Sequence, residues 1–286
     1  MKAEILKEEL KKALMICERV TRKAMGLPIL QNVLIKAENN QLEFTTTNLE
    51  TTIKFWVLAK VKKPGELTSS AGLLANLVNL VASDKVELSE SAGNLMVLAQ
   101  NQENQLPTQS SQDFPIIPKM ENADVWQVAV ENLATGLGQL VEIPATSQLH
   151  PSITGLLFDF KGGQLTMVAT DSFRLAEKKM PTQKDGKKEG SFILPQAPAR
   201  ELLNILGQEQ GQVNIYFNTN QVMFELLAGE RPKIRVQSRL VEGDYPKYQE
   251  IIPQSSTTQI RLERELLSNQ VKQAGQIGRA SCRERV

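Results

Sequence analysis

Apolar and polar residues alternate along two pairs of segments, and a short polar turn interrupts each pair. The alternation runs over residues 34–44 and 156–168, and it is broken by Glu38-Asn39-Asn40 and by Lys161-Gly162-Gly163. A period of two around turns of this composition predicts two β-hairpins. Further strands are expected over residues 85–98, 212–227 and 233–240, and loops over the polar stretches 100–112 and 183–189.

Apolar residues recur every three to four positions in four other segments, which are therefore predicted to be amphipathic helices. They span residues 8–22, 70–82, 131–142 and 198–207. Ser69 and Ser70 are suited to cap the second helix, and Pro198 is suited to open the last. Two helices for each group of antiparallel strands predict an α+β fold, with the helices on one face of the sheet.

The first helix separates its side chains into an apolar half and a basic half. The apolar half is predicted to contain Leu6, Leu10, Ala13, Leu14, Ile16, Cys17 and Val20. The basic half carries Lys7, Lys11, Lys12, Arg19 and Arg22, and Lys23 follows it. Such a face could contact phosphates without reading bases. A solvated surface is the alternative, because Glu4, Glu8 and Glu18 are interspersed there.

The chain also repeats itself over a long distance. Residues 27–51 align without a gap on residues 150–174, an offset of 123, and residues 113–118 have a looser echo in residues 244–253. A period of this length indicates tandem duplication of a whole domain, because solenoid repeats are much shorter. The predicted domains are residues 1–120 and 121–253, followed by the start of a third, incomplete domain over residues 254–276.

Composition narrows the function. The 286 residues contain 33 basic and 32 acidic side chains, one histidine and two cysteines, and 41% of them are hydrophobic. This is enough apolar material for packed cores and too few ligands for a zinc site or a disulfide framework. Neither a signal peptide nor a membrane span is apparent, so a soluble, cytoplasmic protein is expected. A net charge of +1 argues against static binding of nucleic acid by charge.

Two residues could carry catalysis. His150 has Ser147 and Ser152 nearby, but no nucleophile elbow is present, so it is interpreted as an ordinary turn residue. Asp171 could be a catalytic or metal-binding carboxylate, yet its repeat partner Asn48 cannot ionise, which favours a turn-capping role. No phosphate-binding loop or metal motif occurs, and neither an enzyme nor a cofactor is expected.

Four sequence stretches together resemble one family, the beta subunit (sliding clamp) of bacterial DNA polymerase III. They are Leu27-Pro28-Ile29-Leu30, Thr47-Asn48-Leu49-Glu50, residues 169–176 (ATDSFRLA) and residues 238–246 (SRLVEGDYP). The resemblance implies a clamp fold of tandem domains, each with two helices packed on antiparallel sheet. It also implies a non-catalytic processivity factor, a head-to-tail homodimer when full length, that encircles double-stranded DNA. The implied partners are the catalytic subunit of the polymerase, the clamp loader and other proteins with a clamp-binding motif.

The family binds a short apolar peptide between its second and third domains. Carried onto this sequence, the second-domain wall of that site comprises Ile153, Thr170, Ser172, Phe173, Arg174, Leu175, Pro246 and Ile251. The alternative is that Ile153, Leu175 and Ile251 are simply core residues. Phe173 stands where the family usually has histidine, and Gln249-Glu250 stand where a basic residue is common.

The resemblance places the basic half of the first helix, Lys7, Lys11, Lys12, Arg19, Arg22 and Lys23, against DNA. Residues 70–82 lack the basic residue that the family often places there, so weak, salt-sensitive contact is expected. A scaffold of clamp fold that never encircles DNA is the alternative function.

The resemblance covers residues 1–276, and the arginine-rich residues 277–286 abandon the apolar periodicity. They are interpreted as a non-native tail, with a genuine basic tail as the alternative. A chain truncated within its third domain is expected to be monomeric or prone to aggregation.

Overall fold

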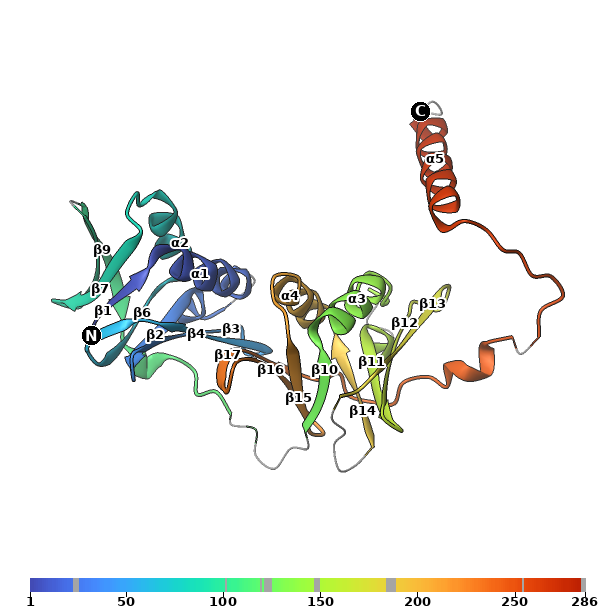
Figure 1. Cartoon of the computed structure of the whole chain (residues 1–286), viewed down its shortest axis with the longest axis horizontal. Helices are drawn as coiled ribbons and strands as arrows, with labels where there is room; N and C mark the ends of the chain where they lie inside the picture. Colours follow the sequence, from blue (N-terminus) through green and yellow to red (C-terminus); the bar gives the residue numbers. More distant parts are fainter. Residues whose placement is uncertain are drawn as a thin grey trace. The chain divides into compact units, whose positions relative to one another are not determined.

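The computed structural model describes residues 1–22, 26–100, 102–118, 120, 125–146, 150–183, 189–253 and 255–283, with the main chain alone from residue 277. The chain divides into two compact units, residues 1–245 and 246–286. Figure 1 labels their helices and strands.

The first unit contains two repeats of one order of elements, to which the first repeat adds β5 and η2 in the described chain. The first repeat consists of β1 (Lys2–Leu6), α1 (Lys7–Thr21), η1 (Pro28–Gln31), β2 (Asn32–Glu38), β3 (Gln41–Thr47), β4 (Thr51–Leu58), β5 (Lys60–Lys63), β6 (Gly65–Ser70), α2 (Ala71–Leu80), β7 (Lys85–Ser91), β8 (Asn94–Ala99), β9 (Gln102–Gln109) and η2 (Ser111–Asp113). The second repeat consists of β10 (Val125–Ala129), α3 (Val130–Leu140), η3 (Pro151–Ile153), β11 (Gly155–Lys161), β12 (Gln164–Thr170), β13 (Leu175–Pro181), β14 (Gly190–Pro195), α4 (Gln196–Leu206), β15 (Gln212–Phe217), β16 (Gln221–Ala228) and β17 (Arg231–Arg239). The tandem duplication predicted from the sequence is therefore visible in the order of elements.

The two repeats share a sheet. In the described chain its strand order is β10-β15-β16-β17-β4-β3-β2-β6-β9-β8-β7-β1-β5, and β13-β12-β11-β14 form a second sheet. All the pairings are antiparallel, including that between β17 of the second repeat and β4 of the first. This pairing sets Ile234 opposite Phe55 and Val236 opposite Ile53.

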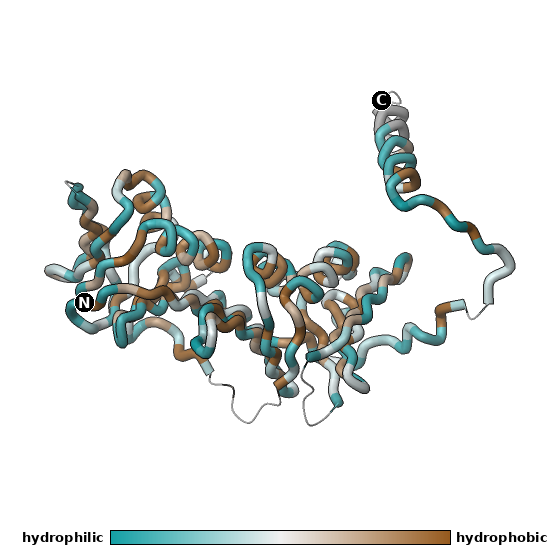
Figure 2. The backbone as a smooth tube through the Cα atoms, viewed as in Figure 1, coloured by the Kyte–Doolittle hydropathy of each residue, from teal (hydrophilic) through white to brown (hydrophobic). Residues whose placement is uncertain are grey.

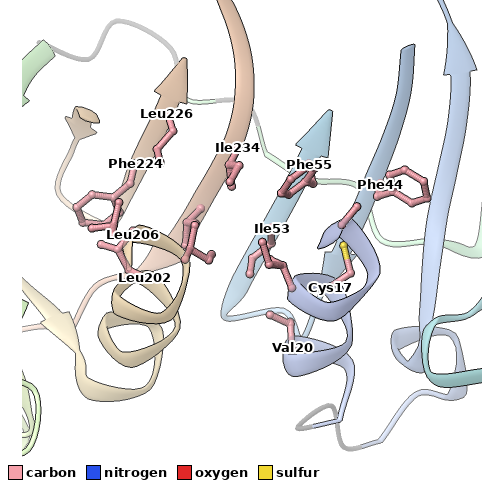
Figure 3. Packing of buried hydrophobic residues seen from close by; sticks show 14 of the residues in the cluster. Cys17, Val20, Phe44, Ile53, Phe55, Leu202, Leu206, Phe224, Leu226 and Ile234 are labelled. Atoms are coloured by element: carbon pink, nitrogen blue, oxygen red, sulfur yellow. The ribbon is translucent and has the colours of Figure 1, made fainter. Parts of the chain in front are cut away.

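Paired residues of adjacent strands project from the same face of a sheet, so these four side chains share one face. All four are buried. Figure 3 shows Ile53, Phe55 and Ile234 facing α1 and α4, with Cys17 and Val20 on α1 and Leu202 and Leu206 on α4. Hydrophobic and hydrophilic residues alternate along the tube of this unit in Figure 2, as expected for elements with one buried face. The helices α1 and α4 therefore cover one face of the shared sheet, and the apolar layer continues across the junction of the repeats.

The helices begin in ways that follow from their first residues. Ser70 caps α2, because its hydroxyl accepts the amide of Leu73 at 3.4 Å. The helices α1 and α3 lack a capping side chain, and their first amides donate instead to the carbonyls of Asp84 (2.8 Å) and Gly211 (2.9 Å). This capping is the same in both repeats.

Three expectations from the sequence are wrong. Residues 102–109 of the expected polar loop form β9, in which exposed positions alternate with partly buried ones from Asn104 onward. Leu6 is 54% exposed because β1 continues to it and α1 begins one residue later. Pro198 does not open the last helix, which starts at Gln196 and keeps the proline within its first turn, where no amide donor is needed.

The second unit contains η4 (Tyr248–Ile251) and α5 (Arg264–Arg283). Apolar and polar residues alternate over residues 260–263, as they would in the first strand of a third repeat, but these residues form no strand. The domain boundaries at residues 120, 253 and 276, and the non-native character of residues 277–286, stay predictions.

Candidate functional site

Five residues predicted for the peptide site lie at the turn between β12 and β13: Thr170, Ser172, Phe173, Arg174 and Leu175. The Thr170 hydroxyl donates to the carbonyl of Arg174 at 2.8 Å and accepts the amide of Ser172 at 3.2 Å. Ser172 has a φ of 75°, a left-handed conformation that costs a residue with a side chain about 1–2 kcal/mol. The hydroxyl of Thr170 therefore holds a turn that the backbone alone would not favour.

Asp171 fixes the other side of the turn. Its Oδ1 accepts the amides of Phe173 at 3.0 Å and Arg174 at 2.9 Å, and its Oδ2 accepts Nε of Arg174 at 2.9 Å. The amide of Arg174, followed by its side chain and the amide of Phe173, lowers the pKa of the Asp171 carboxyl. The predicted turn-capping role of Asp171 is confirmed.

His150 precedes η3, and its carbonyl accepts the amide of Ile153 at 3.2 Å, as expected for a turn residue. Ser147 lies outside the described residues.

The turn presents one aromatic ring and one guanidinium. Phe173 is 100% exposed, which is unusual for a phenylalanine and typical of a contact residue. Arg174 is restrained, because its Nη2 donates to the carbonyl of Glu142 at 3.0 Å while its Nε is bound by Asp171. A restrained guanidinium beside an exposed ring can bind an apolar segment together with a carbonyl or carboxylate group.

The other three predicted residues are placed differently. Ile153 is 6% exposed and belongs to the core, as the alternative interpretation held. Its carbonyl accepts the amide of Ala145 at 3.0 Å, so it supports the segment that holds Arg174 through Glu142. Pro246 and Ile251 belong to the second unit, where Ile251 is 71% exposed. Leu175 is half-buried at the start of β13.

The basic half of α1 is less available than its sequence indicates. Lys12 Nζ lies 2.6 Å from Oε1 of Glu209, and Arg22 Nη2 lies 2.8 Å from Oε1 of Glu18. Lys7, Lys11 and Arg19 make no ion pair with any residue that the structure describes. Lys11 is exposed, while Lys7 and Arg19 are half-buried. Lys23 lies outside the described residues.

Glu209 and Glu142 are functional candidates that the sequence did not suggest. Glu209 is 7% exposed at its side chain and contacts both Lys12 and Lys233 at 2.6 Å. The carboxylate of Glu142 pairs with Arg200 of α4 at 2.8 Å, while its carbonyl holds Arg174. Both glutamates follow the last turn of a helix, a position where the sequence pattern shows no distinguishing signal.

Among the described residues, no group of three or more His, Cys, Asp or Glu side chains is arranged to hold a metal ion. No described helix is long and apolar enough to cross a membrane.

Comparisons with known proteins agree on one family. Residues 1–118 match the N-terminal domain of the DNA polymerase III beta subunit, and residues 127–247 match its central domain. The beta sliding clamp of Chlamydia muridarum is 25% identical over 274 residues, which cover 96% of this chain and 73% of that protein. The crystal structure of the DNA polymerase III subunit beta from Pseudomonas aeruginosa superposes with a TM-score of 0.83 at 26% identity, covering 90% of this chain and 69% of that one. The sliding clamp from Bacillus subtilis has the same fold, with a TM-score of 0.83 at 24% identity over 90% of this chain and 68% of its own.

Proposed function

The chain belongs to the DNA polymerase III beta subunit family, the beta sliding clamps, and from this premise we propose that it serves as a processivity factor that encircles duplex DNA and tethers the replicative polymerase. The family is that of a non-catalytic subunit. The chain would act in the bacterial cytoplasm, and its partners would be double-stranded DNA, the polymerase catalytic subunit, the clamp loader and other proteins with a clamp-binding motif.

One observation carries the proposal: β17 of the second repeat pairs with β4 of the first, and α1 and α4 pack on the same face of the joined sheet. Repeating this junction around a circle produces a ring with helices on one wall and sheet on the other. A ring holds DNA by topology, so it tolerates the near-neutral charge of +1 and the ion pairs that neutralise Lys12 and Arg22.

The same junction supports a head-to-tail homodimer. The order of elements in the two repeats sets β9 in correspondence with β17, since each is the last strand of its repeat, and β4 in correspondence with β13. Residues 102–106 of β9 have no partner on their second side within the described chain, and β13 is an edge of its sheet. A β9 edge of one protomer paired with a β4-like edge of another would close the ring by the contact already present between the repeats.

We assign partner binding to the turn after β12 and weak DNA contact to the basic half of α1. The resemblance adds Pro246 and Ile251 of the second unit to the residues proposed for partner binding. Phe173 supplies contact area and Arg174 supplies a polar anchor at the rim. For DNA contact, Lys11 is the clearest candidate, because it is exposed and makes no ion pair with a described residue.

The test uses the full natural gene product that contains this chain, loaded onto nicked circular DNA by a bacterial clamp loader with ATP. Gel filtration then separates protein on DNA from free protein, before and after one restriction cut. A ring leaves the cut DNA through its ends, and blocking both ends with bound streptavidin restores retention. Retention that is the same before and after the cut would instead support a scaffold that does not encircle DNA. This alternative is favoured by the small number of unpaired cations on α1 among the described residues.

A further inference from the structure

The peptide-site turn of the second repeat has a counterpart in the first repeat, at the junction of β4 and β17. Leu49 has a φ of 74°, against 75° for Ser172 at the position 123 residues later. The Thr47 hydroxyl accepts the amide of Leu49 at 3.1 Å, as Thr170 does for Ser172. Asn48 Oδ1 accepts the amides of Glu50 (3.1 Å) and Thr51 (2.7 Å), as Asp171 does for the amides of Phe173 and Arg174.

A groove of about 200 Å³ lies beside this counterpart turn. Its lining includes Thr47, Leu49, Glu50 and Thr52 at the turn, Pro115 and Ile116 after η2, and Arg239 of β17. Adding 123 to the first four of these gives Thr170, Ser172, Phe173 and Leu175, which are all predicted peptide-site residues. The echo of residues 113–118 in residues 244–253 likewise sets Pro115 against Pro246 and Ile116 against Ile251. Six predicted wall positions therefore recur around one groove, and every residue that lines it belongs to the first unit.

The groove continues along the sheet. A second hollow of about 330 Å³ shares Thr52, Ile117, Pro118 and Gln237 with it and adds Lys54, Met120, Met223 and Arg235. Gln237 Nε2 donates to the carbonyl of Pro118 at 3.1 Å and so anchors residues 115–118 beside the sheet. Because they share these four residues, the two hollows are adjacent parts of one surface that an extended peptide could follow.

The chemistry of the lining restricts what can bind. Leu49 is 49% exposed and Ile116 is 95% exposed, so one wall is an apolar contact surface without a cover in the described chain. Lys54 and Arg235 are ion-paired with Glu43 (2.7 Å) and Glu225 (2.6 Å). Arg239 is exposed and makes no ion pair with any described residue. The groove therefore offers an aliphatic subsite beside an available guanidinium.

We propose that this groove is a second peptide-binding site, which takes an extended segment of a partner protein with an aliphatic side chain against Leu49 and Ile116 and an acidic side chain against Arg239. The choice of a peptide as ligand rests on the peptide site proposed above, because both turns share one geometry. The preference differs between the sites, since Glu50 stands where the other turn has Phe173 and Thr51 stands where it has Arg174. The aromatic contact is absent here, and the guanidinium comes from β17 instead of the turn.

The test measures fluorescence anisotropy of a fluorescein-labelled peptide, Gly-Leu-Asp-Leu-Gly, on the full chain and on point variants. Ile116→Ser and Arg239→Gln are each expected to weaken binding about tenfold, and Glu50→Gln is expected to strengthen it by removing a like charge. Leu58→Ser is the matched control, because Leu58 is also an exposed aliphatic residue, 71% exposed, and does not line the groove. Replacing the aspartate of the peptide by lysine should abolish the effect of Arg239→Gln.

The Phe173→Ser variant separates this inference from the proposed function. Unchanged binding in Phe173→Ser with loss in Ile116→Ser supports the second site, whatever the first site does. Loss only in Phe173→Ser places the peptide at the turn after β12 and overturns the inference while leaving the proposed function intact. Absence of binding up to about 1 mM of the protein also overturns it.

Discussion

Lys12 of α1 lies 2.6 Å from Glu209, so a helix of the first repeat is ion-paired with the segment that follows α4 in the second. Glu209 is 7% exposed at its side chain and is shared with Lys233 at 2.6 Å. A carboxylate this buried is stable only with its charge compensated. Lys12 was predicted to contact DNA, but its ion pair with Glu209 makes it part of the junction between the repeats.

Glu209→Gln is expected to strengthen contact with DNA. The substitution removes a negative charge beside α1 and releases Lys12. If Lys12 then binds one phosphate, the slope of log K against log salt concentration becomes steeper by about 0.9. Titration of duplex DNA at several salt concentrations measures the slope. Glu230→Gln changes the net charge equally at the exposed turn between β16 and β17 and serves as the control. An equal slope in the two variants would contradict the prediction.

Asp171→Asn and Asp171→Ala are expected to separate the turn from the ion pair. Asparagine keeps the acceptor for the amides of Phe173 and Arg174, as Asn48 does in the first repeat, and loses only the contact with Arg174 Nε. Because that ion pair is exposed, Asp171→Asn should leave the free energy of unfolding nearly unchanged, while Asp171→Ala, which loses the acceptor for both amides, should lower it measurably. Urea unfolding of both variants measures this difference.

The variant Asp171→Ala also tests how the stability of the protein depends on acid pH. The amides and guanidinium that bind Asp171 lower its pKa below the ordinary value of 3.8. Its contribution is therefore present above pH 3.8 and is lost as the pH falls through the lowered pKa. The difference in stability between wild type and Asp171→Ala should shrink only as the pH falls below 3.8, and a smaller difference already at pH 5 would contradict the assignment.

The sequence predicted the repeat, the helices and the turn residues because these depend on local patterns. Asn48 and Asp171 cap their turns in the way that their side-chain chemistry requires. The prediction from sequence was wrong at β9, because neighbouring strands impose the extended conformation on a polar stretch. It could not show that Lys12 is neutralised by Glu209, because the two residues lie 197 positions apart in the chain and only the β4–β17 junction brings their repeats together. The first-repeat groove was hidden for the same reason, since β17 supplies one of its walls.

Gly155→Ala is expected to destabilise the fold, while Gly138→Ala is expected to stabilise it. A Cβ at Gly155 would lie 2.5 Å from the carbonyl oxygen of Leu194, a backbone atom that β14 holds in place. Relieving this overlap should cost about 1–3 kcal/mol. A Cβ at Gly138 within α3 would meet only Leu203 Cδ1 at 3.9 Å, and alanine gains about 0.5–1 kcal/mol over glycine inside a helix. Thermal unfolding of both variants tests whether their stabilities change in opposite directions. Destabilisation by Gly138→Ala would contradict the open space found beside this position of α3.

Cys17 is expected to remain unreactive in the folded protein. Its side chain is fully buried on α1, and burial raises the pKa of the thiol from 9.0 to about 12. Since the thiolate is the nucleophile, both the burial and the raised pKa suppress alkylation. In a Cys282→Ser background, where Cys17 is the one remaining cysteine of the two, iodoacetamide at pH 8 should label the protein at its rate of unfolding. Labelling as fast as that of a free thiol would contradict the packing of α1.

The raised pKa of Cys17 also predicts an alkaline loss of stability. Above pH 9 the thiol ionises in the unfolded chain, while the folded chain keeps its proton up to about pH 12. The folded state then binds more protons, so stability is fully present below pH 9 and falls as the pH rises through this interval. Cys17→Ala removes the titrating group and should make the decline between pH 9 and 11 shallower. Urea unfolding at each pH compares the two slopes, with Cys282→Ser as the control for loss of the other thiol. Equal slopes in all three proteins would show that Cys17 is not the group responsible.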